Sequence, residues 1–170
     1  MTAEQVRVAT RRAQDVEEWL GVMAPTLLAY FVRRVTPPEE AADLLSEALL
    51  VLWRRVDAIP HDEDAARMWA FGIARNVLRG HRRTSRRRSA LADRLRAELA
   101  SVEPALPADE RVLDLRSAVD RLKPIDREIV RLVHWDGLSL VEVAELLGKR
   151  EGTVRSRYHR ARTALRAWLA

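Results

Sequence analysis

The sequence predicts an all-α protein built from two small helical domains. Apolar residues make up 48% of its 170 residues, with few aromatic side chains and only six glycines. Several long segments carry apolar residues at helical spacing, and none alternates as a strand would. The stretch "SVEPALPADE" is typical of a linker. We therefore expect domains at 1–84 and 110–170, a flexible linker at 85–109, and a helix-turn-helix in the second domain.

Charge is distributed unevenly along the chain, whose formal net charge is +5. Residues 1–78 carry nine Arg and twelve acidic residues. Residues 79–170 carry 21 Lys and Arg and thirteen acidic residues. The basic character therefore belongs to the second half of the chain, where it indicates a polyanionic partner.

The sequence lacks the signals of secreted and membrane proteins. It contains no Cys, so it offers no disulfide framework and no thiolate metal site. No apolar run approaches the roughly 18 residues that a membrane span needs. The N-terminal segment lacks the apolar centre of a signal peptide. We expect a cytoplasmic protein without membrane insertion.

Three helices are expected in the first domain. Apolar residues recur at helical spacing from 3 to 35, with a break expected near Pro25. The sequence "VTPPEEAADLL" predicts a new helix at 39–56, because prolines end one helix and acidic residues favour the first turn of the next. A proline and a polar cluster predict a loop at 57–64, and the third helix is expected at 65–84.

The second domain is expected to contain four helices, at 110–122, 124–135, 139–147 and 151–169. Pro124 suits the first position of its helix, where the missing backbone N–H is not needed. The short connections between these helices favour a compact bundle.

Residues 137–166, "GLSLVEVAELLGKREGTVRSRYHRARTALR", predict a helix-turn-helix. Ser139 and Glu142 have the spacing of a capping box. Gly148 is placed to end the first helix with a positive φ angle. The expected apolar face of this helix consists of Val141, Val143, Ala144, Leu146 and Leu147.

The last helix has two chemically different faces. Its apolar stripe is Val154, Tyr158, Ala161, Leu165 and Trp168. The opposite face carries Ser156, His159, Arg160 and Thr163, flanked by Arg155 and Arg162. Such a helix can enter the major groove, with Arg160 contacting guanine and Arg155, Arg157 and Arg162 contacting phosphates. The alternative is an amphipathic helix with a solvated Arg-rich face, but the preceding capped helix and turn favour DNA binding.

The expected helix at 39–56 is apolar on nearly every side. Leu45, Leu49, Leu52 and Val56 form one stripe, and Leu44, Leu50 and Val51 lie away from it. Two interpretations stay open. The helix is either the central one of its domain, wrapped on all sides, or it presents a docking face for another protein.

The expected helix at 65–84 combines an aromatic residue with a row of cations. Trp69 precedes the run "RGHRRTSRRR", which has six arginines among residues 79–88. Aromatic platforms beside a positive track hold single-stranded nucleic acid. The alternatives are that Trp69 belongs to the core and that the run is a solvated tail. Core candidates on this helix are Met68, Phe71, Ile73, Ala74 and Val77.

No catalytic constellation is apparent in the sequence. The segment "HDED" at 61–64 is a weak metal site, because the remaining histidines are scattered, and Asp62 or Asp64 fits better as a helix cap. There is no Ser/His/Asp pairing and no phosphate-binding glycine loop. We expect a protein that is not an enzyme and needs no cofactor or metal.

Taken in order, three segments resemble the extracytoplasmic-function group of bacterial RNA polymerase sigma factors. "EEAADLLSEALLVLWRRVD" resembles the family's core-polymerase-binding helix, and "ARMWAFGIARNVLRGHRR" resembles its promoter-melting and −10 recognition helix. "LKPIDREIVRLVHWDGLSLVEVAELLGKREGTVRSRYHRARTALR" resembles its −35-binding domain. The resemblance covers roughly residues 16–170, and the order of the segments makes it specific.

The resemblance implies a factor that binds core RNA polymerase, directs promoter-specific transcription initiation and is controlled by an anti-sigma factor. It implies a region 2-like domain at 1–84 and a region 4-like domain at 110–170. It places core polymerase binding at Asp43, Leu44, Glu47, Leu50 and Trp53. It places −10 DNA binding at Trp69, Arg75, Asn76, Arg79, Arg82 and Arg83, after the loop 58–66. It places −35 DNA binding at Arg150, Thr153, Arg155, Ser156, Arg157, His159 and Arg160.

Other functions stay open at this point. A stand-alone helix-turn-helix regulator would bind a palindrome as a dimer, tightly and without polymerase. A helical protein-interaction module would bind DNA only weakly and without sequence preference, and moderate salt would abolish that binding. A nucleic-acid enzyme is disfavoured by the missing catalytic residues.

Overall fold

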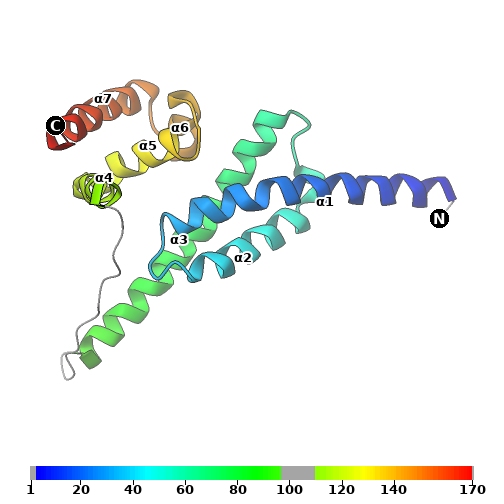
Figure 1. Cartoon of the computed structure of the whole chain (residues 1–170). Helices are drawn as coiled ribbons and strands as arrows, with labels where there is room; N and C mark the ends of the chain where they lie inside the picture. Colours follow the sequence, from blue (N-terminus) through cyan, green and yellow to red (C-terminus); the bar gives the residue numbers. More distant parts are fainter. Residues whose placement is uncertain (1–2, 97–109, 170) are drawn as a thin grey trace. The chain divides into compact units, whose positions relative to one another are not determined.

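The computed structural model describes residues 3–96 and 110–169, and the side chains of residues 15–85 and 115–169. All regular structure in these ranges is helical, and the chain divides into two compact units, Met1–Arg94 and Leu95–Ala170 (Figure 1). The expected all-α fold with two helical domains is confirmed. None of the helices within the described ranges is long and apolar enough to cross a membrane.

Helix α1, Ala3–Val32, is continuous, so the break expected near Pro25 is wrong. Pro25 removes one backbone hydrogen bond, and its ring crowds the carbonyl of the residue four positions earlier. That residue is Gly21, and both positions are exposed, so the helix can adjust on its solvent side. Met23 and Leu27 are buried on the opposite side, where they anchor the helix across this turn.

Helix α2, Glu40–Arg54, packs against α1 and is followed by a short 3-10 turn, η1, at Val56–Ala58. Its buried face is Ala41, Leu44, Ala48 and Leu52. The apolar stripe expected from the sequence does not coincide with this buried face, and only Leu52 belongs to both. Leu44, expected off the core, is only 4% exposed, whereas Leu45, Leu49 and Val56 are half-buried.

Helix α3 spans Glu63–Arg96, so it continues beyond the expected end at residue 84 and through the first part of the expected linker. Residues 97–109 of that linker lie outside the described residues. Asp62 caps the helix, as expected, because its Oδ1 accepts a hydrogen bond of 2.8 Å from the backbone N–H of Ala65. Its buried face includes Phe71, Ile73, Ala74 and Val77, and Met68 is half-buried.

Aromatic rings join α1 to α3 in the core of the first unit. Tyr30 meets Phe31 and Phe71 edge to face, with ring centroids 5.4 and 5.7 Å apart. The guanidinium of Arg34 lies 3.8 Å from the centroid of the Tyr30 ring and donates a hydrogen bond to the Tyr30 carbonyl. Further along α3, His81 Nε2 lies 2.9 Å from a carboxylate oxygen of Glu40 on α2.

The second unit contains α4 (Glu110–Arg121), α5 (Pro124–His134), α6 (Leu140–Leu147) and α7 (Glu151–Leu169). The expected helices agree with these bounds within about two residues, and Pro124 opens α5. Helix α7 packs against the other three helices and so forms the centre of the unit.

The expected helix-turn-helix is present in α6 and α7. Ser139 and Glu142 form the capping box, in which Glu142 accepts a 2.7 Å hydrogen bond from the backbone N–H of Ser139. Gly148 ends α6 with φ 62° and ψ 44°, the left-handed conformation expected from the sequence. Two apolar side chains expected in the core, Val141 and Trp168, are 57% and 40% exposed.

Candidate nucleic-acid interface

The orientation of α7 is fixed by its buried side. Val154 and Ala161 are buried, and Ala161 lies in a cluster with Leu122 and Val130. Because residues of a helix are spaced 100° apart, the polar residues of α7 point away from this cluster. The exposed set is Thr153, Arg155, Ser156, His159 and Arg160, with Arg150 exposed just before the helix. The structure therefore gathers six of the seven expected −35-binding residues on one solvent-facing side.

Arg157 lies elsewhere. Its Nη1 donates a 2.9 Å hydrogen bond to Oδ1 of Asp126, in the first turn of α5. The two side chains are 34% and 17% exposed. Arg157 thus joins α7 to α5, instead of facing outward with the expected phosphate-binding residues among which the sequence placed it.

Two further contacts involve Tyr158 of α7. The Tyr158 hydroxyl lies 3.0 Å from Nε2 of His134 at the end of α5. The guanidinium of Arg162 lies 5.6 Å from the centroid of the Tyr158 ring. Arg155 forms an ion pair with Glu151 one turn earlier, but both side chains stay open to solvent. The exposed face is therefore held in place by contacts made on the other sides of the helix.

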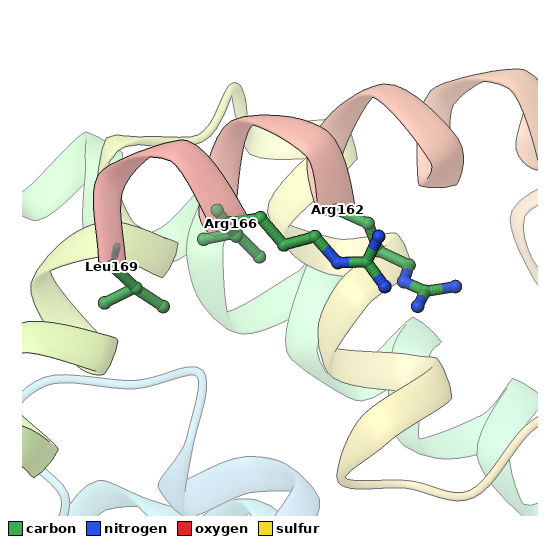
Figure 2. Close-up of a pocket in the computed structure, with 4 residues that line it drawn as sticks. Arg162, Arg166 and Leu169 are labelled. Carbon is green, nitrogen blue, oxygen red and sulfur yellow. The ribbon is translucent and has the colours of Figure 1, made fainter.

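A hollow on the surface runs along the last turns of α7, lined by Arg162, Leu165, Arg166 and Leu169 (Figure 2). Figure 2 shows the side chains of Arg162 and Arg166 extending in the same direction along the helix. All four of these residues come from α7. In the described part of the chain, no group of His, Asp and Glu could hold a metal ion.

A second polar face lies on α3, opposite the buried residues Ala70, Phe71, Ala74 and Val77. Asn76, Arg79, Arg82 and Arg83 are exposed, and Trp69 and Arg75 are half-buried. At 100° per residue these positions fall within one continuous arc of the helix. The structure therefore brings all six expected −10-binding residues onto one face, and Trp69 lies at the edge of that face, not in the core.

The third face lies on α2. Leu50 and Trp53 are 55% and 50% exposed, and Asp43 and Glu47 are exposed beside them. Leu44, expected in the same set, is buried on the other side of the helix and supports it from within. Sequence reasoning missed Arg54, which is exposed on this face. Its spacing of four residues from Leu50 was the signal that could have found it.

Comparisons with known proteins show the family of this chain. The family described as Sigma-70 region 2 matches residues 23–88, and Sigma-70, region 4 matches residues 113–165. ECF RNA polymerase sigma factor SigL of Mycobacterium tuberculosis is 31% identical over 149 residues, which cover 86% of this chain and 84% of SigL. ECF RNA polymerase sigma factor EcfG of Rhodopseudomonas palustris is 32% identical over 145 residues, or 85% and 80% of the two chains.

Two solved structures share the fold of this chain. The sigma factor RpoE of Bartonella quintana, solved with the anti-sigma factor NepR, matches with a TM-score of 0.73 and 26% identity, over 92% of this chain and 97% of RpoE. CnrH, solved with the cytosolic domain of CnrY, shares the fold, with a TM-score of 0.63 and 20% identity over 99% and 97% of the chains. The chain matches both family regions, and its relatives are matched over most of their length, so it belongs to the extracytoplasmic-function sigma factors of bacterial RNA polymerase.

Proposed function

We propose that this sigma factor uses three helix faces for three tasks in promoter-specific transcription initiation. The face of α2 binds core RNA polymerase, the face of α3 holds the melted −10 strand, and the face of α7 reads the −35 duplex. The supporting observation is that each face lies on the exposed side of a helix whose opposite side is buried in its own unit. The protein then acts where RNA polymerase works, in the bacterial cytoplasm.

The face of α7 suits the major groove. The first turns of a recognition helix approach base edges, and here they carry Thr153, Ser156 and Arg160. A guanidinium can donate two hydrogen bonds to guanine, so Arg160 is the base-reading residue we propose. Arg150 and Arg155 lie at the margin of the face, where phosphate contacts fix the position of the helix on the duplex.

The face of α3 suits a single strand. Trp69 offers an aromatic surface for stacking, and Asn76 offers amide hydrogen bonds to a base edge. Arg79, Arg82 and Arg83 continue the face along the helix, where they can follow the sugar-phosphate backbone. Binding the separated strand more tightly than the duplex would favour melting at the −10 element, because the melted state gains these contacts.

The face of α2 suits a protein partner. Two large apolar side chains, Leu50 and Trp53, are half exposed to water, and acidic Asp43 and Glu47 border them. Exposed aromatic and aliphatic residues ringed by polar groups are typical of the centre of a protein interface. We propose that core polymerase covers this patch.

We also propose that an anti-sigma factor controls this chain. The related RpoE is solved in complex with one. An inhibitor that covers Leu50 and Trp53 would bury the same apolar surface that we assign to polymerase, so the two partners would compete.

Reconstitution tests the proposed function. The purified chain is added to sigma-free bacterial core polymerase with genomic promoter fragments, and transcript starts are mapped. We expect defined starts that are lost with Arg160→Ala or with Leu50→Ala combined with Trp53→Ala. Arg166→Ala, at an exposed arginine near the far end of α7, serves as the matched control. Tight duplex binding without polymerase, and no new starts, would instead establish a stand-alone regulator.

A further inference from the structure

Two polar contacts join neighbouring residues of α7 to opposite ends of α5. Nη1 of Arg157 donates a 2.9 Å hydrogen bond to Oδ1 of Asp126, in the first turn of α5. The hydroxyl of Tyr158 lies 3.0 Å from Nε2 of His134, the last residue of α5. Asp126 and His134 are separated by about 12 Å along the helix, at about 1.5 Å per residue. Two adjacent side chains of α7 thus reach two distant points on one neighbouring helix.

These polar contacts lie on either side of the apolar contact between the two helices. Val154 and Ala161 are the buried residues of α7, and Ala161 shares a buried cluster with Val130, near the middle of α5. At about 100° per residue, Arg157 lies about 50° to one side of this buried stripe, and Tyr158 lies about 50° to the other. A rotation of α7 about its own axis would therefore move one of these side chains away from α5 and press the other against it. Apolar contacts are not directional, whereas the two polar contacts together oppose rotation in both senses.

The rotation of α7 decides where its base-reading side chains point. Side-chain tips lie about 6 Å from a helix axis, so a rotation of about 20° moves them by about 2 Å. A binding group has to be held within about 0.5 Å and 10–20° of its productive geometry. Ser156 and Arg160 are exposed to solvent, so the contacts made on the buried side of α7 have to supply this precision.

We propose that Arg157 and Tyr158 are positioning residues that fix the rotation of α7 relative to α5. They act through Asp126 and His134, and they keep Arg160 aimed at one base pair of the −35 duplex. This proposal rests on the assignment of Arg160 to a base in the proposed function. It goes further, because side chains that touch no base would then set part of the sequence preference.

The test measures how the holoenzyme, formed from the full chain and core polymerase, discriminates among −35 sequences. Fragments from a mapped promoter carry single base-pair changes in the −35 element, and the preference ratio compares affinity for the preferred and the changed sequence. Arg157→Met removes the charge and the donor, and Tyr158→Phe removes only the hydroxyl. We expect each to lower the preference ratio at the base pair read by Arg160 about threefold, and the two together to remove most of it.

Three comparisons separate positioning from a general loss of stability. In a chain that already carries Arg160→Ala, Arg157→Met and Tyr158→Phe should not change the preference at that base pair, because the side chain that they orient is gone. Arg157→Lys keeps the charge and a donor, so it should restore part of the preference that Arg157→Met removes. Ser139→Ala lowers the stability of the same unit at the start of α6, and it should leave the preference ratios unchanged.

Glu151→Gln is the matched control for a lost ion pair. Glu151 pairs with Arg155 on the same helix, so this contact cannot fix α7 relative to α5. The substitution removes an acid beside the DNA, so it should strengthen binding to all sequences evenly and leave their ratios unchanged. Asp126→Asn, in contrast, weakens the contact between the helices and should lower the preference as Arg157→Met does.

The outcomes distinguish positioning from the proposed function. If Arg157→Met weakens binding evenly over all sequences and Asp126→Asn has no effect, Arg157 contacts a phosphate and the positioning role is overturned. It is also overturned if Arg157→Met combined with Tyr158→Phe leaves every preference ratio unchanged. In both cases the assignment of Arg160 survives. If the unaltered holoenzyme discriminates among no −35 sequences, both that assignment and the positioning role fail.

Discussion

At the scale of single residues, two glycines of the second unit should respond to the same substitution with opposite signs. Gly148 has a positive φ, so Gly148→Ala forces a Cβ into the left-handed region and should destabilise the unit by about 1–2 kcal/mol. Gly152 lies in the first turn of α7 with open space around it, so Gly152→Ala should stabilise by about 0.5 kcal/mol. Denaturant unfolding of the full chain measures both free energies. Equal changes would contradict the reading of Gly148 as a conformational requirement.

Arg160 and Arg155 should also differ, because one is assigned to a base and the other to a phosphate. Arg160→Ala should cost about 1–3 kcal/mol on the preferred −35 sequence and relax the preference at one base pair. Arg155→Ala should weaken binding evenly over all sequences. Holoenzyme binding to a panel of fragments with single −35 changes measures both effects. A uniform loss for Arg160→Ala would move that residue to the phosphates.

The contact between Arg157 and Asp126 marks a limit of reading residues one at a time. Helical spacing placed Arg157 next to residues of the polar face, and its chemistry matched theirs. Its partner is 31 residues away, at the start of α5, and only the packing of α5 against α7 brings the two together. Arg157→Ala should therefore lower stability by about 1 kcal/mol, since the pair is partly screened by solvent. Denaturant unfolding of Arg157→Ala and Arg155→Ala tests this prediction. Arg155→Ala serves as the comparison because its exposed ion pair with Glu151 contributes little to stability.

At the scale of elements, the capping box should hold the start of α6 as a unit. Ser139→Ala removes the acceptor for the backbone N–H of Glu142 and should cost about 1 kcal/mol. Glu142→Ala frees the N–H of Ser139 at the same end of the helix. Because the two contacts share one helix end, the double substitution should cost less than the sum of the single ones. Strict additivity in denaturant unfolding would contradict a coupled cap.

The helices themselves differ in how well the sequence predicts them. The observed helices of the second unit agree closely with the expected ones, because Pro124, Ser139 and Gly148 mark helix ends by their chemistry. Helix α2 is leucine-rich on several faces, so spacing alone left its buried side undecided, and its packing against α1 selects Leu44. Helix α3 ended too early in the prediction, because the linker was expected to begin at residue 85 and so included Arg86, Arg87 and Arg88, although arginine is a good helix former.

The candidate faces were predicted better than the core. An exposed face needs only its residue types and a helical period, and both can be read from the sequence for α3 and α7. Whether a particular apolar residue is buried depends on the neighbouring helix, which the sequence does not specify locally. This explains why Val141 and Trp168 were expected inside and lie outside. Trp168 finds a partner at the edge of its unit, where the guanidinium of Arg121 lies 4.8 Å from its ring centroid.

At the scale of the whole molecule, the charge asymmetry of the sequence agrees with the division of tasks. The acidic first part of the chain contains α2, whose exposed acidic residues border the patch assigned to polymerase. The basic remainder contains the arginines of α3 beyond residue 78 and the whole recognition helix. Each of the two units therefore contributes cations to a face assigned to DNA, so neither should account for promoter binding alone.

This division can be measured through salt. Each phosphate contact releases counterions, so the logarithm of affinity falls linearly with the logarithm of salt concentration, with a slope of about −0.9 per contact on duplex DNA. We expect the holoenzyme to show a steep slope on a complete promoter fragment. A fragment without the −35 duplex should lose the part of the slope contributed by α7. A fragment without the single-stranded −10 segment should lose the part contributed by α3, and neither truncation should abolish binding.

A stand-alone regulator would behave differently on the same fragments. Its affinity and salt slope would stay unchanged without the −10 strand, would vanish without the −35 duplex, and would not depend on core polymerase. Arg79→Ala and Arg155→Ala provide an internal check, because each should reduce the slope by about one on the complete fragment. On a fragment that lacks the DNA assigned to its own unit, each substitution should leave the slope unchanged. That crossed pattern would arise only if the two units bind the two promoter elements separately.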